Sequence, residues 1–150
     1  MKKIFAISIA LILCFSCVVA ASAKTITFVE DSANLITDSE DLYNLNNYAE
    51  MIEREYGYTI IFCAVDNVET SELTDYAKDA YYSYTDSENG YVFIHNVNTG
   101  YYSTFSVGQG EFLDDYENEL LEAYNTEQDE YAGRVEAFYG KAEEFVENNK

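Results

Sequence analysis

The chain has 150 residues, 28 of them acidic and 8 basic, so its formal net charge at pH 7 is −20. This charge disfavours nucleic acids and anionic membrane surfaces as partners, because phosphate groups are bound by Lys and Arg side chains. The length suffices for one domain with a substantial hydrophobic core.

The N-terminal segment has the three regions of a secretory signal peptide. Lys2 and Lys3 precede an apolar run over 4–20, and Ala21-Ser22-Ala23 matches an A-x-A cleavage site. We therefore expect residues 1–23 to be a signal peptide and residues 24–150 to form one secreted or extracytoplasmic domain. The rest of the sequence has no second apolar stretch of membrane-spanning length, so we expect no membrane anchor after cleavage.

The first half of the expected domain alternates strands and helices. Residues 25–29 predict a strand, and Thr37-Asp38-Ser39-Glu40 has the T-x-x-E form of a helix capping box. Gly57 is a typical left-handed helix end, and residues 58–65 form a nearly continuous apolar run, typical of a strand covered on both faces. The helix between them places four apolar residues on one face: Leu42, Leu45, Ala49 and Ile52.

Cys63 lies within this apolar run and is the single cysteine left once Cys14 and Cys17 leave with the signal peptide. No disulfide can then form within the chain. We interpret Cys63 as a small buried apolar residue.

The second half continues with a helix and then a hairpin. Thr70 or Ser71 is expected to cap a helix that ends before a polar loop at 83–90. Strands are predicted at 91–97 and 101–107, joined by the turn Asn98-Thr99-Gly100. Two helices follow, at about 112–125 and 128–148. Most tyrosines are interpreted as residues at the border of the core, with hydroxyls in water.

The predicted order is β-α-β-α-β-β-α-α. Helical crossovers between the first three strands imply parallel neighbours, and the hairpin makes the fourth strand antiparallel. The expected fold is therefore α/β: a three-layer α/β/α sandwich around a mixed, mostly parallel four-stranded sheet.

Five segments, in order, resemble the TPM domain family. They are Asp31-x-Ala33-x-Leu35-Ile36-Thr37, Tyr56-Gly57 before 60–65, Asp75-Tyr76-Ala77, the strand 89–94, and Gly108-x-Gly110. The resemblance implies an α/β/α sandwich in an extracytoplasmic or lumenal setting. It also implies acid phosphatase activity and divalent-metal binding in some members and an accessory role in others. One departure is that Thr99-Gly100-Tyr101-Tyr102 stands where the family usually has an Arg, the natural clamp for a phosphoryl group.

Two sheet edges carry candidate ligands. Asp31 and Asp66 follow neighbouring parallel strands and are the first-choice metal ligands at the carboxyl edge, where ligands of open α/β sheets bind. Asp31 has an alternative role as the cap of the turn that follows it. Asp86 and Glu88 are the candidates at the opposite edge, near Gly108-Gln109-Gly110, with a solvated acidic loop as the alternative.

We interpret His95, in mid-strand, as a packed and hydrogen-bonded residue. The leading hypothesis is an exported TPM-like protein of the cell envelope or exterior that binds Ca²⁺, with Mg²⁺ as the other cation considered. One alternative is a metal-assisted acid phosphatase, in which Asp31 positions the metal or the nucleophilic water. The other is a non-catalytic domain that docks an envelope or extracellular protein.

Overall fold

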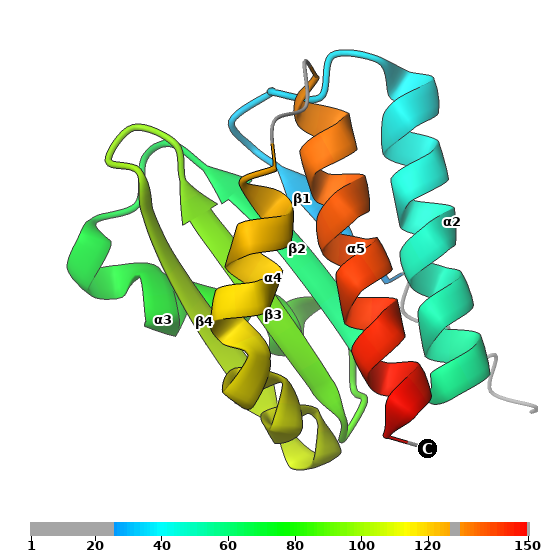
Figure 1. The fold of residues 1–150 in the computed structure, drawn as a ribbon. Coiled ribbons are helices and arrows are strands. Elements are labelled where there is room, and N and C mark those ends of the chain that lie inside the picture. Colours follow the sequence, from blue (N-terminus) through cyan, green and yellow to red (C-terminus); the bar gives the residue numbers. More distant parts are fainter. Residues whose placement is uncertain (1–25, 127–129, 150) are drawn as a thin grey trace, which may run out of the picture.

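Four strands and four α-helices form the part of the chain that the computed structural model describes, residues 26–126 and 130–149. The predicted signal peptide and its cleavage site lie outside these residues. The elements, drawn in Figure 1, are β1 (Val29–Asp31), α2 (Ser39–Tyr56), β2 (Thr59–Val65), α3 (Leu73–Tyr84), β3 (Gly90–Asn96), β4 (Tyr101–Val107), α4 (Glu117–Tyr124) and α5 (Tyr131–Asn148). Short 3-10 helices, η1 (Thr70–Glu72) and η2 (Gly108–Tyr116), precede α3 and α4. The predicted element order is confirmed.

The sheet has the strand order β1-β2-β3-β4. The pairs β1–β2 and β2–β3 are parallel, and β3–β4 is antiparallel. Helix α3 covers one face, while α2, α5 and α4 lie side by side on the other (Figure 1). The predicted three-layer α/β/α sandwich with a mixed, mostly parallel sheet is therefore confirmed.

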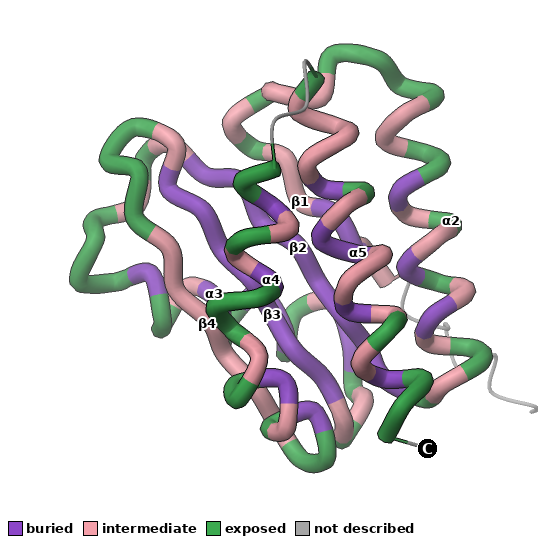
Figure 2. Tube along the Cα trace, in the orientation of Figure 1, coloured by how far each residue is buried: buried purple, intermediate pink, exposed green. Residues whose placement is uncertain are grey.

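The hydrophobic core has two layers because β2 and β3 are buried on both faces (Figure 2). Alternate residues of β2 point to opposite sides of the sheet. Phe62 and Ala64 join the layer under α2, α4 and α5, whereas Cys63 and Val65 join the layer under α3. Cys63 is a buried free thiol, as its position in an apolar run indicated.

Four of the fifteen tyrosines are buried more deeply than expected. Tyr81, Tyr91, Tyr124 and Tyr139 are fully buried, and three of their hydroxyls find partners inside the protein. The exception is Tyr91, whose buried hydroxyl has no hydrogen-bond partner among the described residues. These four rings fill the core, and their hydroxyls are shielded from water. Most of the other tyrosines are half-buried or exposed, as expected.

The first strand and the first helix cap differ from the prediction. The first strand, predicted at 25–29, runs over Val29–Asp31. The amides of Phe28 and Val29 donate to the side-chain oxygen of Asn46, at 3.0 and 3.2 Å, while the Phe28 carbonyl accepts from the amide of Phe62 in β2 at 2.8 Å. The cap of α2 is Asp38 and not Thr37, since the Asp38 carboxylate accepts from the amide of Glu40 at 2.8 Å. Asp is the stronger N-cap of the two residue types.

The helix ends confirm one prediction and correct two. Gly57 ends α2 in the left-handed conformation with φ 79°. The expected cap at Thr70 or Ser71 is wrong, because both residues lie inside η1, where the amide of Glu72 donates to the Glu69 carbonyl at 2.9 Å. The helix expected at 112–125 begins as the 3-10 helix η2 and becomes α-helical only at Glu117.

Candidate functional site

A row of aligned residues crosses the whole sheet near the carboxyl edge of the parallel strands, which is uppermost in Figure 1. Asp31 of β1 is aligned with Ala64 of β2. Ala64 in turn is aligned with His95 of β3, which is aligned with Tyr102 of β4. Side chains at aligned positions share one face, here the face covered by α2, α4 and α5. Between Asp31 and His95, Ala64 contributes only a methyl group to this row.

Asp31 holds the loop that follows β1. One of its carboxylate oxygens accepts from the amide of Leu35 at 3.0 Å, and the other accepts from the amide of Ile36 at 2.7 Å. The loop includes Asn34, which has a positive φ of 56°. Asp31 therefore has the turn-capping role that the sequence analysis left open. Each oxygen still keeps a lone pair for a further ligand.

Asp66 lies at the same edge, immediately after β2. Its side chain accepts from the Asn67 amide group at 2.5 Å, and its backbone carbonyl accepts from the Asn98 side chain at 2.5 Å. Asn98 belongs to the hairpin turn, so the turn is tied to the end of β2. The strand register thus brings Asp31, Asp66 and the turn to one edge, as expected, but each aspartate bonds to its own loop.

His95 is enclosed by tyrosines at this edge. Its Nδ1 atom lies 2.8 Å from the Tyr124 hydroxyl and 3.2 Å from the Tyr131 hydroxyl. The Tyr124 hydroxyl donates to Tyr131 at 2.6 Å, and the His95 ring stacks on Tyr102 with centroids 4.6 Å apart. Burial, together with the positive charge of Arg134, lowers the pKa of His95 to about 4. His95 is a packed, hydrogen-bonded histidine, as predicted, and its lowered pKa keeps it neutral at pH 7.

Arg134 is a member of this edge that the sequence analysis missed. Its Nε donates to the Tyr124 carbonyl at 3.0 Å, and its Nη2 donates to the Asn125 side chain at 3.0 Å. Its guanidinium lies 4.3 Å from the centre of the Tyr124 ring. Only a weak sequence signal pointed to Arg134, which follows Tyr131 by one helical turn. The other arginine of the chain, Arg54, lies in the last turn of α2.

Glu30 is a second missed residue, on the opposite face of β1. Its carboxylate accepts hydrogen bonds from the hydroxyls of Tyr76 and of Tyr84, the latter at 3.0 Å. The Cys63 thiol lies 3.7 Å from the same carboxylate. Burial, and then the negative charge of Glu30, raises the pKa of Cys63 well above its ordinary value. This thiol is therefore held in its protonated form.

The opposite edge of the sheet brings the 85–89 loop against the glycine turn, as expected. Gly108 has φ 59°, and a Cβ atom there would lie 2.0 Å from the Glu88 carbonyl oxygen. The amide of Gln109 donates to the Asn89 side chain at 2.9 Å. The side chains of Asp86 and Glu88 are exposed beside this contact. Their assignment as cation ligands stays a prediction.

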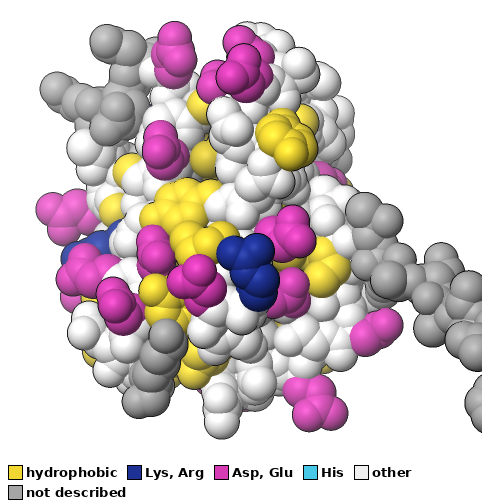
Figure 3. Space-filling view, turned by 90° about the vertical axis from the view of Figure 1, so that its right-hand side faces the viewer, with side chains coloured by type: hydrophobic (Ala, Val, Ile, Leu, Met, Phe, Trp, Pro, Cys, Tyr) yellow, Lys and Arg dark blue, Asp and Glu magenta, His cyan; other side chains and the backbone are white. Residues whose placement is uncertain are grey.

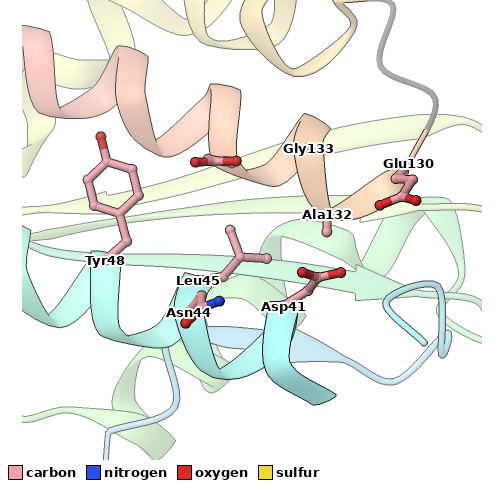
Figure 4. A pocket seen from close by; sticks show the side chains of 8 residues that line it. Asp41, Asn44, Leu45, Tyr48, Glu130, Ala132 and Gly133 are labelled. Carbon is pink, nitrogen blue, oxygen red and sulfur yellow. The ribbon is translucent and has the colours of Figure 1, made fainter. Parts of the chain in front are cut away.

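Two adjoining grooves open between the N-terminal parts of α2 and α5. They have volumes of about 550 and 410 Å³ and share Asp41, Glu130 and Ala132. Figure 4 shows Asp41 and Tyr48 projecting from α2, with Glu130 at the start of α5. Figure 3 shows acidic side chains spread over this side of the molecule, with hydrophobic ones between them. The grooves therefore have an acidic rim.

Within 26–126 and 130–149, no group of three or more His, Cys, Asp or Glu side chains is arranged to hold a metal ion. The assignment of Asp31 and Asp66 as cation ligands stays a prediction. In the same part of the chain, no helix combines the length and hydropathy needed to cross a bilayer.

The fold defines a three-layer α/β/α domain with polar groups gathered at the carboxyl edge of its sheet. It is similar to the BA42 protein of the psychrophilic bacterium Bizionia argentinensis, with a TM-score of 0.60 and 14% identity over 74% of this chain and 81% of that one. It is also similar to the N-terminal domain of a protein from P. gingivalis, with a TM-score of 0.59 and 11% identity over 85% and 86% of the two chains. No family model and no curated protein matches the sequence. At these identities the likeness shows a shared fold.

Proposed function

We propose that this protein is an exported, TPM-like accessory domain that binds a divalent cation, Ca²⁺ in the first place and Mg²⁺ in the second, at the carboxyl edge of its sheet. The observation that carries the proposal is the Asp31 carboxylate, which two backbone amides hold at the end of β1. A carboxylate fixed in this way needs no reordering to accept a cation. Asp66, at the end of the neighbouring strand, supplies a second negative charge.

The number of protein ligands sets the expected strength. Ca²⁺ takes six to eight oxygen ligands, and two carboxylates leave much of the shell to carbonyls and water. We therefore expect a dissociation constant of about 10⁻⁴–10⁻³ M, the range of extracellular calcium modules. For a constant of 1 mM, 10 mM Ca²⁺ would stabilise the domain by about 1.4 kcal/mol, which corresponds to a few degrees in Tm.

The test is a titration of the chain from Lys24 with Ca²⁺ and with Mg²⁺, followed by calorimetry and thermal unfolding. Without Lys2 and Lys3 this chain keeps 6 basic and 28 acidic residues, a formal net charge of −22 that any cation will screen, so each titration is compared with NaCl at equal ionic strength. The variants Asp31→Asn and Asp66→Asn keep the side-chain shape and should abolish the specific part of the shift. Asp86→Asn and Glu88→Gln are the matched controls at the opposite edge. A wild-type shift equal to that in NaCl would refute cation binding, and a loss confined to the control variants would move the site to the other edge.

Arg134 favours acid phosphatase activity as a second candidate function. Arg is the side chain suited to bidentate binding of a phosphoryl group, and Arg134 restores a guanidinium to an edge where strand β4 lacks one. Asp31 would position a metal or the attacking water. The test is an assay of the hydrolysis of a chromogenic phosphate ester. The hydrolytic activity should co-purify with the protein through several steps. Activity should be lost in both Asp31→Asn and Arg134→Lys. Activity that persists in Asp31→Asn would show that Asp31 is not catalytic.

A further inference from the structure

The outer edge of β4 is long and uncharged. Among the described residues, β4 pairs only with β3, and it forms the outermost strand in Figure 1. Its seven residues, Tyr-Tyr-Ser-Thr-Phe-Ser-Val, include no charge, Pro or Gly, although 24% of the chain is charged. Proteins usually protect such edges with Lys, Pro, bulges or short strands. The other edge is protected: β1 has three residues, and the amides of Phe28 and Val29 are bonded to Asn46.

The hydrogen bonds of β3 show which groups of β4 face outward. The amide of Val97 donates to Val65, and the carbonyl of Asn89 accepts from Thr59, so the odd-numbered residues of β3 bond to β2. Its even-numbered residues therefore bond to β4, where the aligned partners are again odd-numbered. The free N–H and C=O groups at the outer edge are then those of the even-numbered residues: Tyr102, Thr104 and Ser106.

The two faces beside this edge differ in chemistry. On the face of η2, the Ser106 hydroxyl donates to Asp114 at 2.5 Å, so a carboxylate borders the edge. On the face of α3, Phe105 packs against Tyr82, with ring centroids 5.9 Å apart. Lys78 lies between Thr74 and Tyr82 on the helix stripe that faces β4, because residues four apart share a helix face. One face is thus acidic, and the other is aromatic and carries a cation.

We propose that the outer edge of β4 docks an extended segment of a partner polypeptide, which adds a fifth strand to the sheet. Alternate side chains of that segment are Lys or Arg on the face of Asp114. The others are β-branched or aromatic, without Lys or Arg, on the face of Phe105 and Lys78. A second copy of this chain fits less well, because its own β4 offers no basic residue to Asp114. Strand addition supplies backbone hydrogen bonds for affinity, and alternate side chains supply specificity.

The test uses a blocked nonapeptide of alternating Val and Lys and the chain from Lys24, which contains every described helix and strand. The control peptides alternate Val and Glu, or contain the first peptide's residues in an order that breaks the alternation. Amide hydrogen exchange is read by NMR. At saturation, the amides of Tyr102, Thr104 and Ser106 should exchange at least about tenfold more slowly. The amides of Ser103 and Phe105, which already bond to β3, should keep their rates.

Two substitutions separate backbone pairing from charge. Thr104→Pro removes an outward N–H without removing a bond to β3, and Pro is tolerated at such edge positions. It should weaken peptide binding at least about tenfold, while Thr104→Val, which keeps the N–H, should retain it. Asp114→Asn should weaken the Lys peptide severalfold and reduce the salt dependence of its affinity. If Thr104→Pro unfolds, Thr104→Lys replaces it, because a basic residue at the edge should repel the same peptide.

Three results would overturn the proposal. The first is equal binding of the Lys and Glu peptides. The second is protection at the groove between α2 and α5 in place of β4. The third is protection of Tyr102, Thr104 and Ser106 that rises with protein concentration in the absence of peptide, which would identify a second copy as the occupant.

Discussion

Protonation of His95 should destabilise the fold, because the folded protein holds this imidazole neutral. Burial and the nearby guanidinium of Arg134 lower its pKa from 6.5 to about 4. The unfolded chain, with the higher pKa, therefore takes up the proton first as the pH falls. Stability linked to His95 is complete above about pH 7, declines through pH 6.5, and stops declining below about pH 4. Full protonation should lower the free energy of unfolding by about 3 kcal/mol, given this difference in pKa. At pH 5 the loss should be about 2 kcal/mol.

The chain allows a direct assay because His95 is its single histidine. Its imidazole resonances are thus assigned without ambiguity, and an NMR titration should give a midpoint near 4 in the folded protein. Unfolding free energies from urea titrations between pH 7.5 and 5 give the linked stability. Since 28 acidic groups also begin to titrate toward pH 5, the wild type is compared with His95→Gln, which keeps a hydrogen-bonding side chain but does not titrate. The difference between the two proteins should shift by about 2 kcal/mol over this range. A midpoint near 6.5, or parallel stability curves, would refute the reasoning.

Three further predictions concern local structure. Asp38→Ala should lower the unfolding free energy by about 1 kcal/mol, as for a lost N-cap, whereas Thr37→Ala, one residue earlier, should change it by less than about 0.5 kcal/mol; urea unfolding measures both. Gly108→Ala should lower it by more than about 1 kcal/mol, because φ is 59° and the new Cβ would meet the Glu88 carbonyl; an unchanged Tm would contradict the close contact. Cys63 should react with a thiol reagent at least about 100-fold faster in denaturant than in the native protein, because burial and Glu30 raise its pKa; rapid native labelling would show that the thiol is accessible.

The order and pairing of the elements could be read from local patterns. The continuous apolar run of β2 indicated a strand covered on both faces, and helical crossovers required parallel neighbours. Boundaries were less accessible, because they depend on competing hydrogen bonds. Asp38 displaced Thr37 as a cap, and the side chain of Asn46 bonds the amides of Phe28 and Val29 at the start of β1. The cap is a local choice between two residue types, whereas the Asn46 bonds join α2 to the start of β1 across 18 and 17 positions, and local propensities do not contain such contacts.

In the candidate site, too, the positions of residues along the sheet could be predicted, and their long-range contacts could not. The parallel strands deliver Asp31 and Asp66 to one edge, as topology predicted. The partners of His95 and Glu30 could not be predicted, because their contacts join distant parts of the chain. His95 meets Tyr131 across 36 positions, and Glu30 meets Tyr84 across 54. A single sequence carries no record of such pairs, so the tyrosine clusters on either face of the sheet were found only in three dimensions.

The two proposals use different edges of one sheet and can fail independently. The carboxyl edge ends in side-chain oxygens held by loop amides, which suits a small cation, whereas the outer edge of β4 offers backbone groups in a row, which suits another strand. Asp31→Asn removes a charge at the carboxyl edge and leaves β4 intact. Thr104→Pro removes a backbone donor at the outer edge of β4 and leaves Asp31 bonded to its loop. If each variant loses only its own ligand, the domain has two separate binding sites. If Asp31→Asn also weakens the Lys peptide, the aspartate acts through the long-range field of the acidic chain, and added salt should erase that effect.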